Sequence, residues 1–290
     1  MKRLLFLIVL FCPPAFAEDL PILWLEAGTD NEMIVRSDDF TRWSLRHEHR
    51  IIGRETAFAD HVRFSVPSIN PGMLLPAIVF RNDTPYRKVF IASPDPFIDR
   101  KAWFEQHPIA IYDPVGTTIE LFEDEEMPFT RLRSFADIEA VENAVIVIGE
   151  GTDFDRERGL AELLFEYAAN GGIVFVAAPV GNIQLDFSHR LRSLLMTDNP
   201  KHLFPDASKR TMMETWNLHS ARSEVMLRGS AMGHDRGMTV VDICFDNIPP
   251  PNGRIIFDRE PIFTKWKTYV ESRWYFKAII ETLLSEPGLH

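Results

Sequence analysis

The sequence predicts an α/β protein in which a largely parallel sheet, with helices on both faces, follows a small β-rich segment. Three observations support this prediction. Short extended segments separated by polar breaks occupy residues 18–84. From residue 85 onward, apolar strand-like runs alternate with helical patterns, which favours a parallel sheet covered by helices. Residues 144–178 show strand, helix and strand with short connections, which is typical of a right-handed parallel crossover.

The chain begins with the pattern of a secretory signal peptide. Lys2 and Arg3 precede the apolar run 4–11, and residues 15–17 are Ala-Phe-Ala, with small residues at the two positions that a signal peptidase reads. We expect cleavage after Ala17 and a periplasmic or extracellular protein. A transmembrane anchor is one alternative, but the apolar run is much shorter than the ~20 residues that span a bilayer. Lipidation at Cys12 is a second, but Phe11 precedes it where a lipoprotein signal has a small residue.

Net charge limits the classes of partner, and the cysteine content limits disulfide formation. The chain has 31 basic and 42 acidic residues, and loss of Lys2 and Arg3 with the signal peptide leaves 29 against 42, a formal charge of −13. This charge repels phosphate backbones and anionic lipid, so we expect neither nucleic acid nor a membrane surface as partner. No segment after the signal peptide is apolar enough to cross a membrane. Only Cys244 remains after cleavage, so no internal disulfide is expected.

The β-rich segment contains four predicted strands, at residues 22–25, 33–35, 62–66 and 74–80. Residues 82–85, Asn-Asp-Thr-Pro, predict a turn before the apolar run 89–92. That run is suited to a strand buried on both faces, and we expect it to be the first strand of the parallel sheet. Asp95 followed by Pro96 predicts the start of a helix, with Asp95 as its N-cap.

The alternation continues through the middle of the chain. Residues 109–112 predict a strand, residues 118–122 predict another, and the acidic run 123–126 predicts a solvated loop. Ser134 followed three residues later by Asp137 predicts a short helix that begins with a capping box.

The crossover unit has the clearest signals. Residues 144–148 and 173–176 predict two buried strands. Between them, apolar residues recur at helical spacing, which predicts a helix capped by Thr152 or Asp153. Residues 170–172, Asn-Gly-Gly, end that helix, because glycine adopts the left-handed conformation readily.

The last third of the chain is less regular. Residues 187–195 predict helical pieces, residues 240–244 and 254–257 predict strands, and residues 264–284 predict a closing helix. The broad apolar face of that helix, which includes Trp274, is expected to pack on the sheet.

Residues 144–181 resemble part of the class I glutamine amidotransferase-like domains, including the trehalose-utilisation-type and uncharacterised exported branches. Residues 148–151, Ile-Gly-Glu-Gly, resemble a turn that offers backbone N–H groups to an oxyanion. Residues 170–172 resemble the helix end, and residues 177–181, Ala-Ala-Pro-Val-Gly, stand where the family has its nucleophile elbow. The resemblance implies a flavodoxin-like sheet within residues 85–290.

The resemblance also shows where the family's chemistry is missing. Pro179 occupies the nucleophile position of the elbow, and proline offers neither a nucleophilic side chain nor an N–H. The family's His-Pro-Glu appears as Asp258-Arg259-Glu260, which keeps an acid but lacks the base. We therefore expect no catalytic residue, no glutaminase or amidotransferase activity, and no cofactor or metal.

Polar residues after three predicted strands are candidates for a ligand-binding crevice, because ligands of open α/β sheets bind outside the carboxyl ends of the strands. The candidates, together with the proline at the bend, are Ser93, Asp95, Glu150, Asp153, Pro179, Asp258 and Glu260. For the acids that begin helices, an N-cap or a favourable interaction with the helix dipole is the alternative role.

Other candidates are explained better by ordinary structural roles. His47 and His49 could share one face of a strand as a metal pair, but the sequence places no third ligand. Asp186 and His189 would share a helix face, and the same objection applies. Cys244 fits a small core residue on a strand.

These observations favour an exported, non-catalytic binding or interaction protein of the cell envelope, whose partner is a carbohydrate or an envelope protein. The alternative is a hydrolase that acts on carbohydrate with a site built from Glu150, Asp153, Asp258 and Glu260. It requires these carboxylates to converge within about 5–9 Å in one pocket. A purely structural domain of a larger complex is a third hypothesis, which a large exposed apolar patch on the N-terminal segment would favour.

Overall fold

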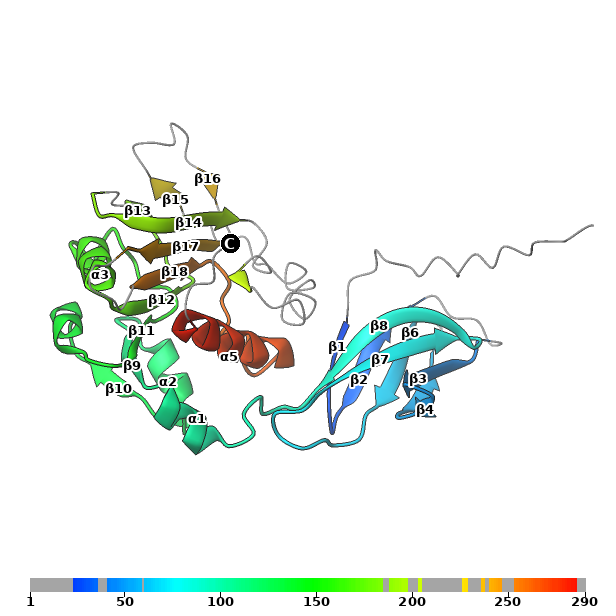
Figure 1. The fold of residues 1–290 in the computed structure, drawn as a ribbon. Coiled ribbons are helices and arrows are strands. Elements are labelled where there is room, and N and C mark those ends of the chain that lie inside the picture. The colour runs from blue at the N-terminus through cyan, green and yellow to red at the C-terminus, as the bar shows by residue number, and fades with distance from the viewer. Residues whose placement is uncertain are drawn as a thin grey trace, which may run out of the picture.

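The structure is a computed structural model of the chain. It describes residues 23–35, 41–58, 60–184, 188–197, 203–204, 226–228, 236–237, 240–246 and 253–285. Within these residues the fold is mixed α/β, with helices and with sheets that include parallel strands (Figure 1). The predicted signal peptide, its cleavage site and Asp186 lie outside the described residues.

The N-terminal part consists of two sheets that enclose one apolar core. The larger sheet has the order β1-β8-β7-β3-β4, and its strands are β1 (Leu23–Glu26), β3 (Trp43–His47), β4 (Arg50–Ile51), β7 (Leu74–Arg81) and β8 (Thr84–Ala92). The smaller sheet has the order β2-β6-β5, and its strands are β2 (Asp30–Ile34), β5 (Arg54–Ala57) and β6 (His61–Ser65). Leu45, Phe64 and Val79 are among the side chains buried between them. The four predicted strands correspond to β1, β2, β6 and β7.

β7 and β8 form an antiparallel hairpin, and the predicted turn joins them. Asn82 and Asp83 have φ of 48° and 60°, the left-handed values that a tight hairpin turn requires. β8 also pairs with β1. The prediction that residues 89–92 begin the parallel α/β sheet is therefore wrong, and the expected boundary after residue 84 falls inside this hairpin. An apolar run specifies a strand, but the tight turn before it decides which strand it pairs with.

The C-terminal part is built on a seven-stranded sheet with the order β10-β9-β11-β12-β18-β17-β14. Its strands are β9 (Ile109–Tyr112), β10 (Thr130–Leu132), β11 (Val145–Ile148), β12 (Ile173–Ala177), β14 (Leu191–Thr197), β17 (Val240–Phe245) and β18 (Arg254–Asp258). The first five in this order run parallel, and β17 and β14 continue the sheet antiparallel. A small sheet contains β13 (Asn182–Gln184), β15 (Met226–Arg228) and β16 (Arg236–Gly237).

Most of the predicted strands of this part are confirmed. The confirmed predictions are residues 109–112, 144–148, 173–176, 240–244 and 254–257. Residues 191–197, by contrast, form a strand where the sequence predicts helical pieces, because they pair with β17 at the edge of the sheet.

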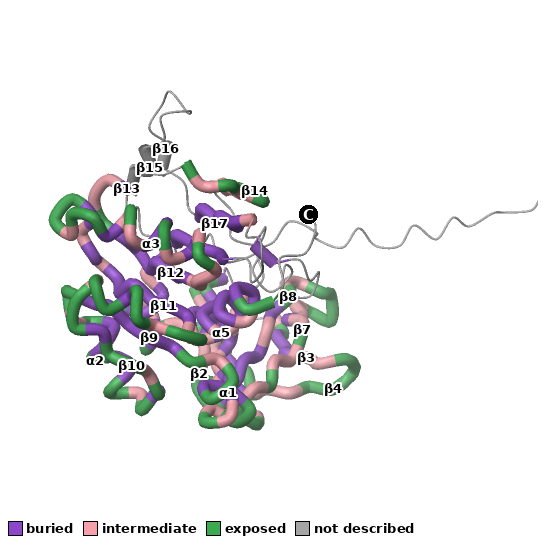
Figure 2. The backbone as a smooth tube through the Cα atoms, turned by 60° about the vertical axis from the view of Figure 1, so that its left-hand side comes forward, coloured by how far each residue is buried: buried purple, intermediate pink, exposed green. Residues whose placement is uncertain are grey.

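Helices lie on both faces of the seven-stranded sheet. They are α1 (Arg100–Gln106), α2 (Thr117–Asp124), the 3-10 helix η1 (Phe135–Ala140), α3 (Leu160–Ala169) and α5 (Val270–Leu284). Side chains of α1, α2 and α5 share one buried cluster with the sheet, and side chains of η1 and α3 share a second. The central strands are buried along most of their length (Figure 2).

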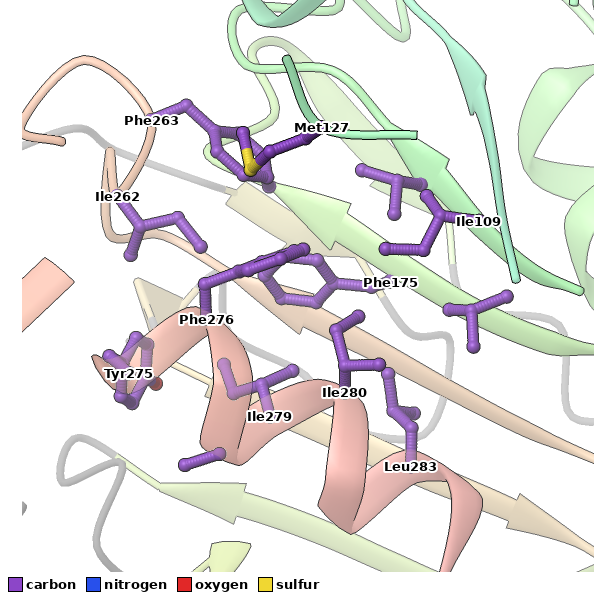
Figure 3. Close-up of a cluster of buried hydrophobic side chains, with 14 of the residues drawn as sticks. Ile109, Met127, Phe175, Ile262, Phe263, Tyr275, Phe276, Ile279, Ile280 and Leu283 are labelled. Atoms are coloured by element: carbon purple, nitrogen blue, oxygen red, sulfur yellow. The ribbon is translucent and has the colours of Figure 1, made fainter. Parts of the chain in front are cut away.

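The first of these clusters lies between α5 and the sheet. Phe276 and Ile280 of α5 meet Phe175 of β12 and Ile109 of β9 there (Figure 3). Each of these four side chains is buried. α5 begins at Val270 rather than at residue 264, because residues 262–268 form turns.

Two helix starts differ from the predictions. Asp99, rather than Asp95, is the N-cap of α1, and its side chain accepts a hydrogen bond from a backbone N–H of the first turn. α3 follows Gly159, whose φ is 89°, and not Thr152 or Asp153. In both cases an acidic residue near the end of a strand suggested a cap, while the loop before the helix is longer than expected.

A third difference concerns residues 118–122, which lie in α2 and not in a strand. Gly116 precedes this helix with a left-handed φ of 96°. The acidic run 123–126 begins in the last turn of α2. The predicted capping box of η1 is confirmed, since Ser134 and Asp137 each accept a hydrogen bond from the other's backbone N–H.

The start of α5 joins the two parts of the molecule. The indole N–H of Trp274 donates to the backbone carbonyl of Ser93 at 3.0 Å. Arg273 forms an ion pair with Glu26 of β1 at 3.2 Å. Trp274 is buried in a cluster with Ala92 of β8, so its packing is against the N-terminal sheet as well as within the C-terminal part.

Candidate functional site

The candidate site is the carboxyl edge of the parallel strands, where the loops after β9, β11, β12 and β18 meet. Backbone hydrogen bonds tie these loops together. Gly149 donates to Tyr112 at 2.9 Å, Gly151 donates to Ala178 at 3.1 Å, and Ala178 donates to Asp258 at 2.6 Å. Parallel strands bring residues that are far apart in the sequence to one edge, and the acidic candidates from two of these loops therefore come together.

Asp113 closes the loop after β9. One carboxylate oxygen accepts the N–H groups of Val115 (3.1 Å) and Gly116 (2.9 Å). The other accepts those of Thr118 (2.8 Å) and Ile119 (3.0 Å). The N-terminus of a helix after a strand is the usual binding position for an anionic ligand in such folds, and here the protein's own carboxylate occupies it.

Sequence reasoning missed Asp113. The available signal was an aspartate directly after a buried strand, followed by Pro114 and, two residues later, by Gly116. The neighbouring loop also adapts to this side chain. A Cβ at Gly149 would lie 2.5 Å from the carboxylate carbon of Asp113, so a residue larger than glycine would collide there.

Glu150 stands in the turn that resembles the oxyanion turn, but its groups are already engaged. Its buried carboxylate accepts the N–H groups of Phe263 (2.5 Å) and Thr264 (2.8 Å) and the hydroxyl of Thr264 (2.7 Å). Its own N–H donates to the hydroxyl of Thr118 at 3.0 Å. Burial raises the pKa of Glu150, while these hydrogen bonds oppose the rise. The turn therefore holds the chain together where the family would offer donors to a substrate.

The bend after β12 lies at Ala178, directly before Pro179. Ala178 has the left-handed φ of 37°. Proline is restricted to φ near −65°, so it cannot occupy the left-handed position itself. Neither alanine nor proline carries a nucleophile. The bend consequently provides no attacking group.

Asp258 is fully buried at the end of β18. One carboxylate oxygen accepts the N–H of Glu260 at 2.9 Å, and the other accepts the hydroxyl of Tyr275 at 2.6 Å. Burial raises the pKa of Asp258 to about 7, and the nearby carboxylates of Glu260 and Glu150 add to the rise. Glu260 is itself buried and forms an ion pair with Lys265 at 3.3 Å.

The predicted site residues thus divide into three places. Glu150, Asp258 and Glu260 gather inside the protein, where their charges interact. Asp153 remains near the surface beside the bend, and it pairs with Arg156 at 3.1 Å. Its side chain lies next to Gly181, where an added Cβ would be 2.9 Å from a carboxylate oxygen of Asp153.

Ser93 and Asp95 lie elsewhere, in the connection between β8 and α1. Ser93 is buried at the junction of the two parts, where Trp274 binds its carbonyl. Asp95 accepts the N–H of Phe97 and pairs with Arg100 at 3.1 Å. The strand before them belongs to the N-terminal sheet, so these residues do not follow a strand of the parallel sheet.

The remaining candidates that the structure describes include His47 and Cys244. Within the described residues, no group of three His, Cys, Asp or Glu side chains is placed to hold a metal ion. His47 lies on β3, and its Nδ1 is 2.6 Å from the carbonyl oxygen of Pro76. Cys244 is buried on β17, and burial raises the pKa of its thiol.

Two of the cavities formed by the described residues lie on the C-terminal part. One of about 440 Å³ lies at the carboxyl ends of β9 and β10, and it is lined by Tyr112, Asp113, Pro114, Arg131, Leu132 and Arg133. The other, of about 580 Å³, lies at the opposite edge of the sheet, and its lining includes Glu139, Val141, Glu142, Leu163, Glu166 and Tyr167. Glu150, Asp258 and Glu260 line neither cavity.

Two comparisons with known proteins were negative. No protein-family model matches the chain, and a search of curated proteins gives no match. Among the helices of the described residues, none combines the length and the apolar character needed to cross a membrane.

Proposed function

We propose that this chain is an exported, non-catalytic binding protein of the cell envelope, built on a degenerate class I glutamine amidotransferase-like domain. Its partner is a carbohydrate or an envelope protein, and the partner binds at the carboxyl edge of the parallel strands. The signal-peptide pattern of the first 17 residues supports export.

The order of the parallel strands supports a flavodoxin-like domain. Numbered along the chain, β9, β10, β11, β12 and β18 are the first to fifth strands, and they lie in the order 2-1-3-4-5 in the sheet. Flavodoxin-like sheets have this order, and their ligands bind at the carboxyl ends of the strands, at the switch point between the first and third strands.

The observation that carries the non-catalytic proposal is the way the edge uses its carboxylates. Asp113, Glu150 and Asp258 all accept hydrogen bonds from the chain's own backbone. A general acid or base must reach the proton that it transfers, and a buried carboxylate held by internal donors does not. The bend at Ala178 and Pro179 adds no nucleophile.

One observation favours the alternative, a hydrolase with a carboxylate-based site acting on carbohydrate. Three buried acids converge, and the pKa of Asp258, at about 7, is suited to proton transfer near neutral pH. The alternative requires an opening that admits substrate to Asp258 and Glu260.

Enzyme assays on the mature protein distinguish the two. We expect glutamine hydrolysis and hydrolysis of a panel of chromogenic glycosides to stay at background between pH 5 and 8. Activity that disappears in both Asp258→Asn and Glu260→Gln, and persists in the surface variant Asp153→Asn, would establish the hydrolase. Binding is measured separately, by amide shift changes in NMR spectra on addition of defined oligosaccharides. We expect saturable changes around Tyr112 and Leu132.

A further inference from the structure

The cavity at the carboxyl ends of β9 and β10 differs in charge from the rest of the protein. We call it the arginine hollow, and its lining is Tyr112, Asp113, Pro114, Arg131, Leu132 and Arg133. The whole chain carries an excess of acidic residues, 42 against 31 basic ones. A volume of about 440 Å³ is in the range of small-molecule sites.

The two arginines come from the edge of the sheet. β10 is the outermost strand on this side and pairs only with β9. Arg131 lies on β10, and Arg133 follows its last residue. Leu132, between them, is buried in the apolar cluster with η1 and α3, which fixes the backbone that carries both guanidinium groups.

Among the described residues, both guanidinium groups keep N–H donors that can bind a ligand. The ion pair of Arg131 with Glu123 has an N–O distance of 3.9 Å, and both side chains are more than half exposed, so water competes strongly with it. The backbone N–H of Arg133 donates to Asp137 at 2.9 Å. Hydrogen bonds from the backbone N–H groups of Ser134 and Arg133 are the main cause of the lowered pKa of Asp137, and the positive charge of the Arg133 side chain adds to them. That carboxylate is held mainly by backbone N–H groups of the capping box.

The acids beside the hollow, Asp113 and Glu157, accept hydrogen bonds from other groups of the chain. The carboxylate of Asp113 accepts four backbone N–H groups and so points into its own loop. Glu157 accepts the hydroxyl of Tyr112 at 2.7 Å. Tyr112 and Pro114 also line the hollow, and neither carries a formal charge.

We propose that the arginine hollow binds a small organic molecule through an oxyanion, a carboxylate or a phosphate, held by Arg131 and Arg133. The planar guanidinium forks match the paired oxygens of such groups. An acidic sugar has such an anionic group on a ring, and the ring could contact Tyr112 and Pro114 in the lining. The inference rests on the proposed binding function and specifies the chemistry of its ligand.

The test is isothermal titration of the mature protein with three probes: galacturonate, glucose 6-phosphate and neutral galactose. We expect at least one anion to bind and galactose not to bind. Arg131→Gln and Arg133→Gln should each weaken binding about tenfold or more. Arg54→Gln removes one exposed charge from β5 in the N-terminal part, and it should leave the affinity unchanged.

The outcome separates this inference from the function on which it rests. Equal affinity in the wild type and in both arginine variants would overturn the inference, and so would an absence of anion binding up to about 10 mM. Binding of neutral oligosaccharides without any preference for an anion would overturn it while leaving the non-catalytic binding function intact. Hydrolysis of a probe would overturn the proposed function instead. Unfolding curves of the two variants should match the wild type, because both arginines are exposed.

Discussion

The two edges of the parallel sheet use carboxylates in opposite ways. At the carboxyl edge, Asp113, Glu150 and Asp258 are buried and accept hydrogen bonds from loops of the chain. At the amino edge, Glu139 and Glu142 are exposed around an open cavity. The comparison shows that an acid's position after a strand does not make it a functional group. An acid can act on a ligand only if its carboxylate oxygens have lone pairs that are free to accept hydrogen bonds. At the carboxyl edge, most of these lone pairs accept hydrogen bonds from the chain itself.

The largest effect should come from Asp113→Ala. The substitution leaves four backbone N–H groups without their acceptor, two of them from buried residues, and we expect a loss of about 4 kcal/mol in the free energy of unfolding. Urea denaturation measures it. A loss below about 1 kcal/mol would mean that water replaces the carboxylate easily and that the loop is not closed by it.

Asp258→Asn should change how stability depends on pH. The raised pKa, about 7 in the folded protein, means that the folded state keeps its proton while the unfolded state has lost it. The contribution of Asp258 to stability is therefore fully present below about pH 4 and is lost as the pH rises through 7, by about 4 kcal/mol. Asparagine does not titrate, so this decline should disappear from unfolding curves taken between pH 4 and 8. A decline that persists unchanged in the variant would assign it to other groups.

Gly149→Ala should have an intermediate effect. The added Cβ would meet the carboxylate carbon of Asp113 at 2.5 Å, and we expect a loss of about 2 kcal/mol. A double-mutant cycle with Asp113→Ala identifies the cause, because the glycine substitution should cost much less once that side chain is gone. Additive losses would contradict the steric explanation.

The smallest effect should come from the amino edge. Glu142→Gln removes an exposed charge that lines an open cavity, and we expect the free energy of unfolding to change by less than about 0.5 kcal/mol. The same urea denaturation provides the measurement. A loss as large as that of Asp113→Ala would remove the distinction between the two edges.

The sequence predicts those elements whose signals are local. The buried strands at residues 145–148 and 173–177 are continuous apolar runs, and the capping box of Ser134 and Asp137 lies within four residues. The sequence predicts a strand at residues 118–122, because a short apolar run fits a strand or a helix equally well. The structure has a helix there, which begins after the left-handed Gly116. Residues 89–92 join the N-terminal sheet through pairing with other strands, one of them distant in the sequence. The spacing of apolar residues along the chain does not predict such pairing.

The candidate site follows the same rule. The gathering of Glu150, Asp258 and Glu260 is predictable, because each lies at or just after the carboxyl end of a strand of one parallel sheet. Tyr275, which holds Asp258, is not predictable, since it reaches the site from a helix that packs across the sheet. Asp113 is an intermediate case. Its hydrogen-bond donors are close in the sequence, but its role can be predicted only if the residues after it are known to begin a helix.

Helix α5 has one consequence for dividing the molecule. Its first turns bind the N-terminal sheet through Arg273 and Trp274, while Tyr275 holds Asp258 at the far edge of the other sheet. A truncated protein that starts at residue 85 would keep half of a hairpin and would lose Glu26, the ion-pair partner of Arg273. The two parts are therefore best regarded as one cooperative unit, and a change in the N-terminal sheet can reach the buried acids through a single helix.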